Sequence, residues 1–320
     1  MNFRTALNWV SPAGPRGGLS ILIFHRVFPE FDPLLPEGID AHHFDALMRW
    51  IKKWFNVLPL AEAVIRLQQG NLPARAAAIT FDDGYADNYE VALSILQRHD
   101  LPATFFIAVG FLGGGRMFND TVIETVRRCQ QPELDLTALG LGRHDLRSIA
   151  KKRQAILVLL QQIKYLLFTQ RQDVVHAIAE ITKVDLPNDL MMTAQQVKQL
   201  REIGMGIGAH TVQHPILARL KAGEAEREIA DSRDYLQELL GESVTLFAYP
   251  NGKPQTGYCY DHVAMVRRLG LQAAVSTAWG VARKGSDRFQ LPRFTPWERT
   301  FWRFGLGLLR NYGRKPIVCG

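Results

Sequence analysis

Short apolar runs alternate with amphipathic segments along most of the chain. Runs of strand length stand at residues 19–24, 76–81, 104–109, 206–209, 244–248 and 273–276. Between them, apolar residues recur at a helical period at residues 44–54, 89–98, 195–203, 224–240 and 261–269. Strands that alternate with helices indicate a parallel sheet covered by helices. About seven or eight such units predict an α/β fold in which the sheet forms a closed or nearly closed barrel.

Residues 113–190 interrupt this rhythm. A run of glycines opens the segment, and helical patterns follow at residues 146–167 and 173–181. We interpret the segment as a helical insertion that lies over the mouth or the side of the barrel. The alternative, a separate small domain, is disfavoured because the segment shows no pair of strand patterns. The sequence thus predicts a single domain over residues 1–320, with this insertion and a C-terminal amphipathic segment at residues 300–314.

The charge balance narrows the choice of partners. Lys and Arg total 38 and Asp and Glu total 31, so the net charge is +7. Such an excess favours solubility, or attraction to phosphate-bearing partners or an anionic membrane surface. No basic run is interleaved with aromatic residues, and we therefore expect no nucleic-acid partner.

The cysteines and the first residues of the chain allow a prediction of the cellular compartment. Cys129, Cys259 and Cys319 lie far apart and are odd in number, which disfavours a disulfide framework or a cysteine metal site and fits a reducing compartment. The first residues lack a signal-peptide pattern, so we expect a cytoplasmic protein. Residues 300–314 mix aromatic, leucine and basic residues, which predicts either peripheral contact with the inner membrane or packing against the barrel.

A pair of acids follows the second apolar run, where the sequence reads TFDDG at residues 80–84. Adjacent carboxylates repel, so the pKa of one must rise unless a cation neutralises them. A metal ion would resolve this and leave one acid as a ligand and the other as a base. Gly84 permits a tight turn that aims both side chains inward. The alternative is an Asp-Gly turn that caps a helix.

A pair of histidines follows a later strand, where the sequence reads HTVQHP at residues 210–215. On one helical turn, this spacing places His210 and His214 on the same face, close enough to share a metal ion. Alone, such a pair is more often two exposed histidines near a helix start. Two histidines together with one carboxylate are typical of a hydrolytic metal site with open coordination positions.

In this order, the two motifs resemble those of the polysaccharide deacetylase family, which includes chitin, peptidoglycan and nodulation-factor deacetylases. The resemblance extends from about residue 19 to residue 294, outside the insertion. It implies a distorted (β/α) barrel. It also implies that Asp83, His210 and His214 bind a divalent metal ion, with zinc expected, and that Asp82 is the catalytic base.

One stretch departs from the family's pattern. The family often has an Arg-x-Pro-Tyr-type motif where this chain has Ala248 at the arginine position and Asn251 at the aromatic position. The backbone N–H of Asn251 is still expected to help hold the developing oxyanion. Arg293 is the candidate replacement for the missing cation, because a salt bridge from it would lower the pKa of Asp82. The alternative is that Arg293 is an ordinary surface arginine.

The catalytic acid must also come from elsewhere. The family's late Leu-x-His motif, which supplies the acid, is absent, and no histidine follows His262. His25 ends the first strand and is our substitute, because a histidine there can point into the barrel mouth and protonate the leaving amine. Its His-Arg-Val context resembles the bacterial exopolysaccharide branch of the family. The alternative is a histidine that is hydrogen-bonded to backbone at a strand end.

These features together predict hydrolysis of an N-acetyl group on an amino sugar, in a glycan or a lipid-linked oligosaccharide, with release of acetate. One alternative keeps the fold and metal but changes the substrate to a cyclic amide or ureide. Another is a catalytically weak glycan-binding protein that has lost its acid and its motif arginine.

Overall fold

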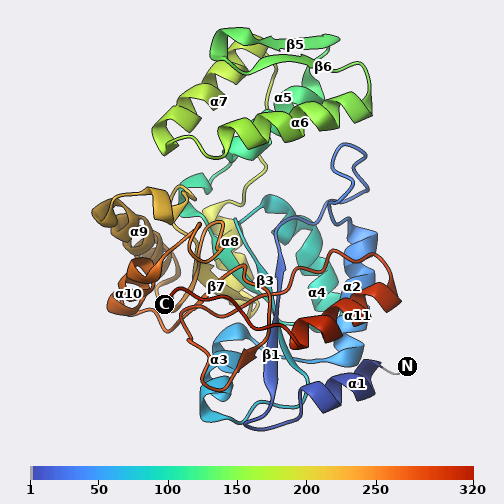
Figure 1. Cartoon of the computed structure of the whole chain (residues 1–320), viewed down its shortest axis with the longest axis vertical. Coiled ribbons are helices and arrows are strands. Elements are labelled where there is room, and N and C mark those ends of the chain that lie inside the picture. The colour runs from blue at the N-terminus through green and yellow to red at the C-terminus, as the bar shows by residue number, and fades with distance from the viewer. Residues whose placement is uncertain (1–2) are drawn as a thin grey trace.

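The computed structural model describes residues 3–320 and contains a curled parallel sheet at its centre (Figure 1). The parallel strands are β1 Gly18–Phe24, β2 Asn56–Val57, β3 Ala76–Phe81, β4 Thr104–Ile107, β7 Gly206–Ala209, β8 Leu246–Ala248 and β9 Ala273–Val275. Their order is β1-β3-β4-β7-β8-β9, with β2 beside β3 and the short β10, Ala282–Arg283, antiparallel to β1. The predicted distorted (β/α) barrel is confirmed, and every predicted strand is present to within a few residues.

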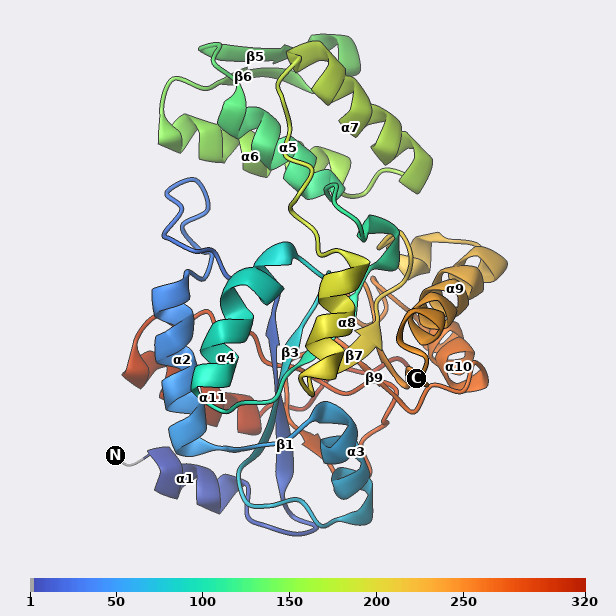
Figure 2. The ribbon, with the colours of Figure 1, turned by 180° about the vertical axis from the view of Figure 1, so that it is seen from behind.

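Helices cover the outer face of this sheet, as the view from behind shows (Figure 2). They are α1 Phe3–Val10, α2 Ala41–Trp54, α4 Leu93–Arg98, α8 Ala194–Glu202, α9 Ala222–Leu240, α10 Tyr260–Arg268 and α11 Phe301–Tyr312. The helix α3 Leu60–Gln69 packs instead with side chains on the opposite face of the strands, among them Ile21 and Ala78. Local sequence sets several of their ends. The Thr193 side chain accepts a hydrogen bond from the N–H of Gln196 and caps α8, and Gly241 ends α9 in the left-handed conformation.

The last part of the barrel wall is an irregular segment, residues 291–294, that runs between β9 and β1. On one side the N–H of Ser276 donates to the Leu291 carbonyl, at 2.8 Å. On the other side the N–H of Phe294 donates to the Ile21 carbonyl, at 2.7 Å. This segment, which we call the barrel seam, is hydrogen-bonded on both sides. It places Arg293 in the interior of the barrel.

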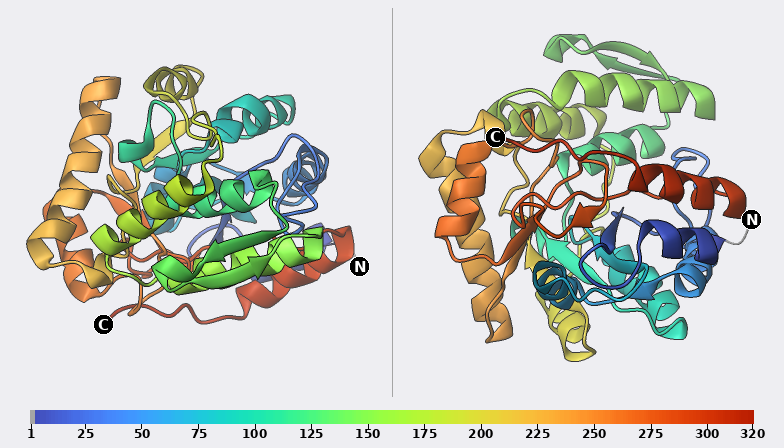
Figure 3. Two further views of the ribbon diagram at one scale, coloured as in Figure 1. Left: turned by 90° about the horizontal axis from the view of Figure 1, so that it is seen from above. Right: turned by 60° about the horizontal axis from the view of Figure 1, so that its bottom comes forward.

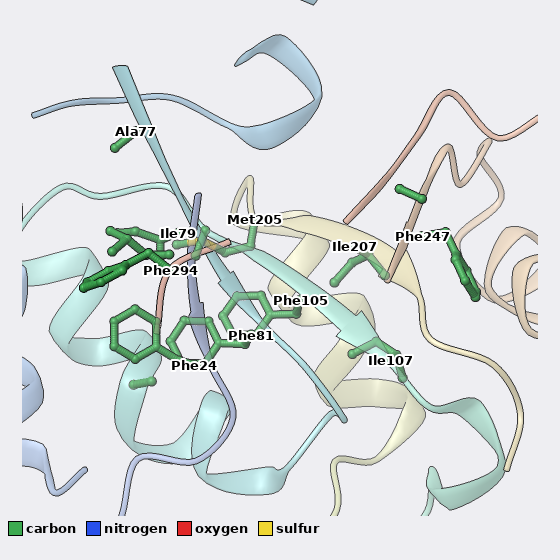
Figure 4. Packing of buried hydrophobic residues seen from close by; sticks show 14 of the residues in the cluster. Phe24, Ala77, Ile79, Phe81, Phe105, Ile107, Met205, Ile207, Phe247 and Phe294 are labelled. Carbon is green, nitrogen blue, oxygen red and sulfur yellow. The ribbon is translucent and has the colours of Figure 1, made fainter. Parts of the chain in front are cut away.

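Aromatic rings from neighbouring strands pack beside one another in the core (Figure 4). The Phe81 ring stacks on Phe105 of β4 with centroids 4.8 Å apart and on Phe24 of β1 at 5.4 Å. Phe81 and Phe24 are the last residues of their strands. The residues that follow them, Asp82 and His25, therefore start from a rigid base at the carboxyl ends of the strands.

The insertion lies over those strand ends (Figure 3). Its elements are α5 Phe118–Arg128, β5 Glu133–Leu136, β6 Gly142–Asp145, α6 Ile149–Ile163 and α7 Phe168–Thr182. The expectation of a purely helical insertion without a strand pair was wrong, because β5 and β6 form an antiparallel hairpin. The hairpin and the three helices share a small core of their own that includes Leu134, Leu159 and Ile178.

The C-terminal amphipathic segment forms α11 and packs on the barrel through Phe304, Leu308 and Tyr312. Trp302 and Leu306 remain exposed on its outer face. Among the described residues, no helix combines the length and the apolar character needed to span a bilayer. Packing against the barrel is therefore observed, while contact of the outer face with a membrane stays a prediction.

Candidate metal centre and active site

The acid pair begins where β3 ends. The N–H of Asp82 still donates to the Phe24 carbonyl, so Asp82 continues the ladder between β1 and β3. Asp83 then adopts a φ of 78° and Gly84 a φ of 88°. A left-handed aspartate costs conformational energy, and such strain is common at functional sites. The turn sends the two neighbouring carboxylates to different partners.

Asp83 meets both predicted histidines. Its Oδ1 atom lies 3.4 Å from Nε2 of His210 and 3.3 Å from Nε2 of His214. One ligand atom from each of the three residues lies within 4.8 Å of the other two. The buried Oδ1 of Asp83 accepts no hydrogen bond from any described residue. A buried carboxylate oxygen facing two imidazole nitrogens is the donor set that a divalent cation completes, so these residues fit a metal ion.

The two imidazoles are prepared for this role in different ways. Nδ1 of His210 donates to the Ala248 carbonyl at 2.7 Å, so in the neutral ring Nε2 is the unprotonated nitrogen that can ligate. Burial lowers the pKa of His210, but Asp82 and Asp83 outweigh it, so its pKa is raised. For His214, burial lowers the pKa to about 4 despite the opposing Asp83 carboxylate. His214 is therefore neutral near pH 7, as a metal ligand must be.

The histidine loop corrects a detail of the sequence interpretation. His210 and His214 were expected on one helical turn, but they lie in a loop in which Thr211 has a φ of 65° and His214 a φ of 50°. Glu228, on α9, accepts hydrogen bonds from the N–H groups of Val212 and Gln213, at 2.8 and 2.9 Å. Sequence reasoning missed Glu228, whose helix gives no sign that it contacts this loop.

Asp82 is held from the barrel seam, although its Oδ2 still lies 3.9 Å from Nε2 of His210. Arg293 holds it with two parallel hydrogen bonds, from Nη1 to Oδ1 at 2.7 Å and from Nη2 to Oδ2 at 2.6 Å. Nε of Arg293 donates to the Ser276 carbonyl at 2.8 Å, which fixes the guanidinium. Arg293 is fully buried, so the alternative of a surface arginine was wrong. Burial raises the pKa of Asp82, but Arg293 and then His210 lower it more, so Asp82 is ionised at neutral pH.

Arg293→Met should move the acidic limb of the pH–rate profile upward by about 1–3 pH units. The pKa of Asp82 is depressed in the native protein because the Arg293 charge outweighs the effect of burial. The variant removes that charge, while Asp82 stays buried, so its pKa should rise. A base with a raised pKa becomes protonated at higher pH, so activity is lost earlier on acidification. The measurement is kcat/KM against pH, with Arg288→Met as the control, because Arg288 is an exposed arginine of the same region. An unchanged acidic limb in Arg293→Met would contradict this role.

His25 lies at the mouth of the barrel, where it lines the same cavity as Asp83. Its side chain is exposed and makes no hydrogen bond to any described residue, so the alternative of an imidazole bonded to backbone is not observed. Its backbone is held instead: the His25 carbonyl accepts from Nδ2 of Asn88 at 2.7 Å. Asp87 accepts from the N–H of Val27 at 3.1 Å and from Arg26 at 2.7 Å. These holding residues were not predicted from the sequence.

Asn251 lies in the loop after β8, three residues beyond the carbonyl that accepts from His210. It has a φ of 52°, and its backbone N–H donates no hydrogen bond to any described residue. An N–H without a partner among the described residues is compatible with the predicted oxyanion contact, which stays a prediction.

Comparisons with known proteins agree with these motifs. The family model described as polysaccharide deacetylase matches residues 69–274. YxkH of Bacillus subtilis, which is named as a polysaccharide deacetylase, is 22% identical over 287 residues, or 89% of this chain and 73% of YxkH. A poly-beta-1,6-N-acetyl-D-glucosamine N-deacetylase of Staphylococcus aureus is 27% identical over 122 residues, or 38% of this chain and 42% of that protein.

Solved structures share the architecture. The Streptococcus pyogenes deacetylase PplD, determined in complex with acetate, superposes with a TM-score of 0.58 at 21% identity, over 87% of this chain and 92% of that one. IcaB from Ammonifex degensii gives a TM-score of 0.57 at 17% identity, over 95% and 99% of the two chains. At such identities the likeness shows the fold alone.

Proposed function

This chain belongs to the polysaccharide deacetylase family, and from that premise we propose that it is a metal-dependent hydrolase that removes the N-acetyl group from an amino sugar. The substrate is a glycan or a glycan precursor, and the product is acetate with a free amino sugar. The observation that carries the proposal is the division of the acid pair. Asp83 faces two histidines, while Asp82 is paired with a buried arginine.

The two acids have separate tasks. A divalent ion, zinc in our proposal, held by Asp83, His210 and His214 would supply Lewis-acid chemistry, acidifying a water molecule and polarising the acetyl carbonyl. Asp82 accepts a proton from the attacking water as its oxygen bonds to the carbonyl carbon. The Arg293 guanidinium keeps Asp82 ionised and fixes its orientation. In our proposal the Asn251 N–H donates to the carbonyl oxygen as negative charge develops there.

Breakage of the carbon–nitrogen bond needs a proton for the departing amine, because an amide nitrogen leaves poorly as an anion. His25 is our candidate donor, since its imidazole shares a cavity with Asp83 and is not engaged elsewhere in the described residues. The proton passes from the imidazole to the sugar nitrogen as the bond to the acetyl carbon breaks.

His25→Gln should flatten the alkaline limb of the pH–rate profile and lower kcat by about 10²–10⁴-fold. Glutamine keeps a polar side chain at this exposed position but cannot supply a proton to the leaving amine. Metal content should stay at the wild-type level. His42→Gln, which changes an exposed histidine of α2, should leave the profile unchanged. A wild-type alkaline limb in His25→Gln would assign the acid to another group.

The proposal is tested by the products formed. The purified protein is incubated with N-acetylglucosamine oligomers, including β-1,6-linked ones, and with a cyclic ureide, and acetate and ring opening are measured. We expect acetate from the oligomers alone. Ring opening without acetate would favour the cyclic amide or ureide alternative, and binding of oligomers without turnover would favour a glycan-binding protein.

Similarity to exopolysaccharide deacetylases supports a glycan of that class as the substrate. A cytoplasmic location with peripheral contact at the inner membrane remains a separate part of our proposal. Its structural support is the exposed outer face of α11, where Trp302 and Leu306 lie beside Arg303 and Arg310. Aromatic and basic residues on one helix face are typical of interfacial helices.

A further inference from the structure

A cavity of about 700 Å³ lies between the strand ends and the insertion. His25, Asp83 and Tyr85 follow the strands and form its floor, and Arg26, Glu37, Asn119 and Arg153 are further polar residues of its lining. Above the floor, aliphatic and aromatic side chains from three separate parts of the chain form the walls. These wall residues, which we call the apolar chamber, are Leu34, Leu35, Ile39, Ile156, Leu157 and Trp297.

The apolar chamber is unusual for a site that would hold only sugar rings. Arg153, Glu37 and Asn119 could pair with some hydroxyls of a further sugar, but hydroxyls that face the aliphatic side chains would lose water without gaining a partner, which is costly. Two of the chamber's side chains are also open to solvent in this state, because Leu157 is 62% exposed and Trp297 is 59% exposed. Large apolar side chains gathered at a cavity mouth mark a binding site for an apolar group.

The chamber is continuous with the reacting centre, which restricts what can occupy it. Whatever fills it lies directly beside the group bound at Asp83 and His25, so the simplest occupant is another part of the same substrate. We propose that the apolar chamber binds an aliphatic chain attached to the N-acetylated sugar, so that the substrate is an amphiphilic glycoside such as a lipid-linked glycan precursor. This inference rests on the proposed function for the sugar end of the ligand.

The two ends of such a ligand match the two parts of the cavity. The acetamido sugar occupies the polar floor, where its hydroxyls and amide can find partners. The chain runs between α6, which carries Ile156 and Leu157, and the loop that carries Leu34 and Ile39. The insertion thus supplies one wall of a substrate site, which explains why it lies over the strand ends.

The test compares methyl and octyl β-glycosides of N-acetylglucosamine as substrates, below the concentration at which the octyl compound forms micelles. Burial of only a few methylenes predicts that KM is at least about tenfold lower for the octyl glycoside. Binding of octyl and methyl β-glucoside, which carry no acetyl group, is measured in parallel by calorimetry, and the same ratio is expected for Kd. Ratios within about twofold of one would overturn the inference.

Variants locate the effect. Leu157→Ser and Trp297→Ser should each reduce the octyl-to-methyl preference by about fourfold, the loss expected for one methylene of contact. Ile149→Ser is the matched control, because Ile149 is an exposed aliphatic residue of α6 outside the chamber and should keep the full preference. A preference that survives both chamber variants would place the chain elsewhere and contradict the inference.

The outcomes separate this inference from the proposed function. Acetate release without any chain-length preference would leave the function standing and remove the amphiphilic substrate. Tight octyl glucoside binding that the chamber variants weaken, without acetate release from any sugar, would support the chamber and contradict the function. N-acetylglucosamine trimers could also bind more tightly than the methyl glycoside, by as much as the octyl glycoside does. If the chamber variants removed that increase in affinity too, the chamber would be a glycan subsite and the inference would be overturned.

Discussion

Replacing His210 by alanine should remove the bound metal ion and, with it, deacetylase activity. His210 is buried, and the Ala248 carbonyl already orients its Nε2 toward Asp83. The variant leaves two protein ligands, Asp83 and His214, which hold a divalent ion poorly against water. Loss of an outer-shell partner alone costs 10–100-fold in metal affinity, so loss of a ligand should cost more than about 100-fold. The measurement is metal per chain after dialysis, by plasma mass spectrometry.

A variant at such a buried position also needs a control for folding. His214→Ala removes a less buried ligand and should give the same metal loss. His176→Ala, at an exposed histidine of α7, should retain full metal and activity. Full metal content in a folded His210→Ala protein would show that the three residues are not the binding site.

Asp82→Asn should lower kcat by about 10²–10⁴-fold while metal content stays at the wild-type level. The amide cannot accept the proton of the attacking water, but Asp82 is not among the three predicted ligands. The variant also leaves the Arg293 guanidinium buried without its counter-charge, which should destabilise the protein by about 3–5 kcal/mol. Rates must therefore be compared at temperatures where both proteins are fully folded.

Asp83→Asn provides the comparison that separates the two acids. It should lower metal content and rate together, because its Oδ1 faces both histidines. Equal metal loss in Asp82→Asn and Asp83→Asn would contradict the division of labour that the structure suggests.

The elements that could be predicted from the sequence are those that buried apolar runs define. The strand at Ala76–Phe81 is entirely apolar or small apart from Thr80, and its bounds were predicted correctly. The hairpin of β5 and β6 was missed because its strands read ELDL and GRHD, so half or more of their residues are charged and half-exposed. A strand that buries one or two residues leaves too weak a pattern to detect.

The site shows the same limit. Asp82, Asp83, His210 and His214 could be chosen because they stand in compact motifs at predicted strand ends. Arg293 could be chosen only by asking which cation replaces the missing motif arginine. Its burial could not be predicted, because it depends on the irregular segment 291–294 that lies between β9 and β1.

Residues that act through long-range contacts could not be recognised from the sequence pattern around them. Glu228 holds the histidine loop from α9, and Asp87 and Asn88 hold the backbone around His25. Each is an ordinary polar residue of a helical segment in the sequence, and its partner lies at least 15 residues away.

The central claim, metal-dependent deacetylation, is tested most directly by acetate release from N-acetylglucosamine oligomers by one protein sample in three states. The sample is assayed as purified, after a chelator has removed its metal, and after zinc has been returned at one equivalent per chain. We expect acetate in the first state, little or none in the second and recovery in the third. Acetate release that is equally fast in all three states would contradict the claim.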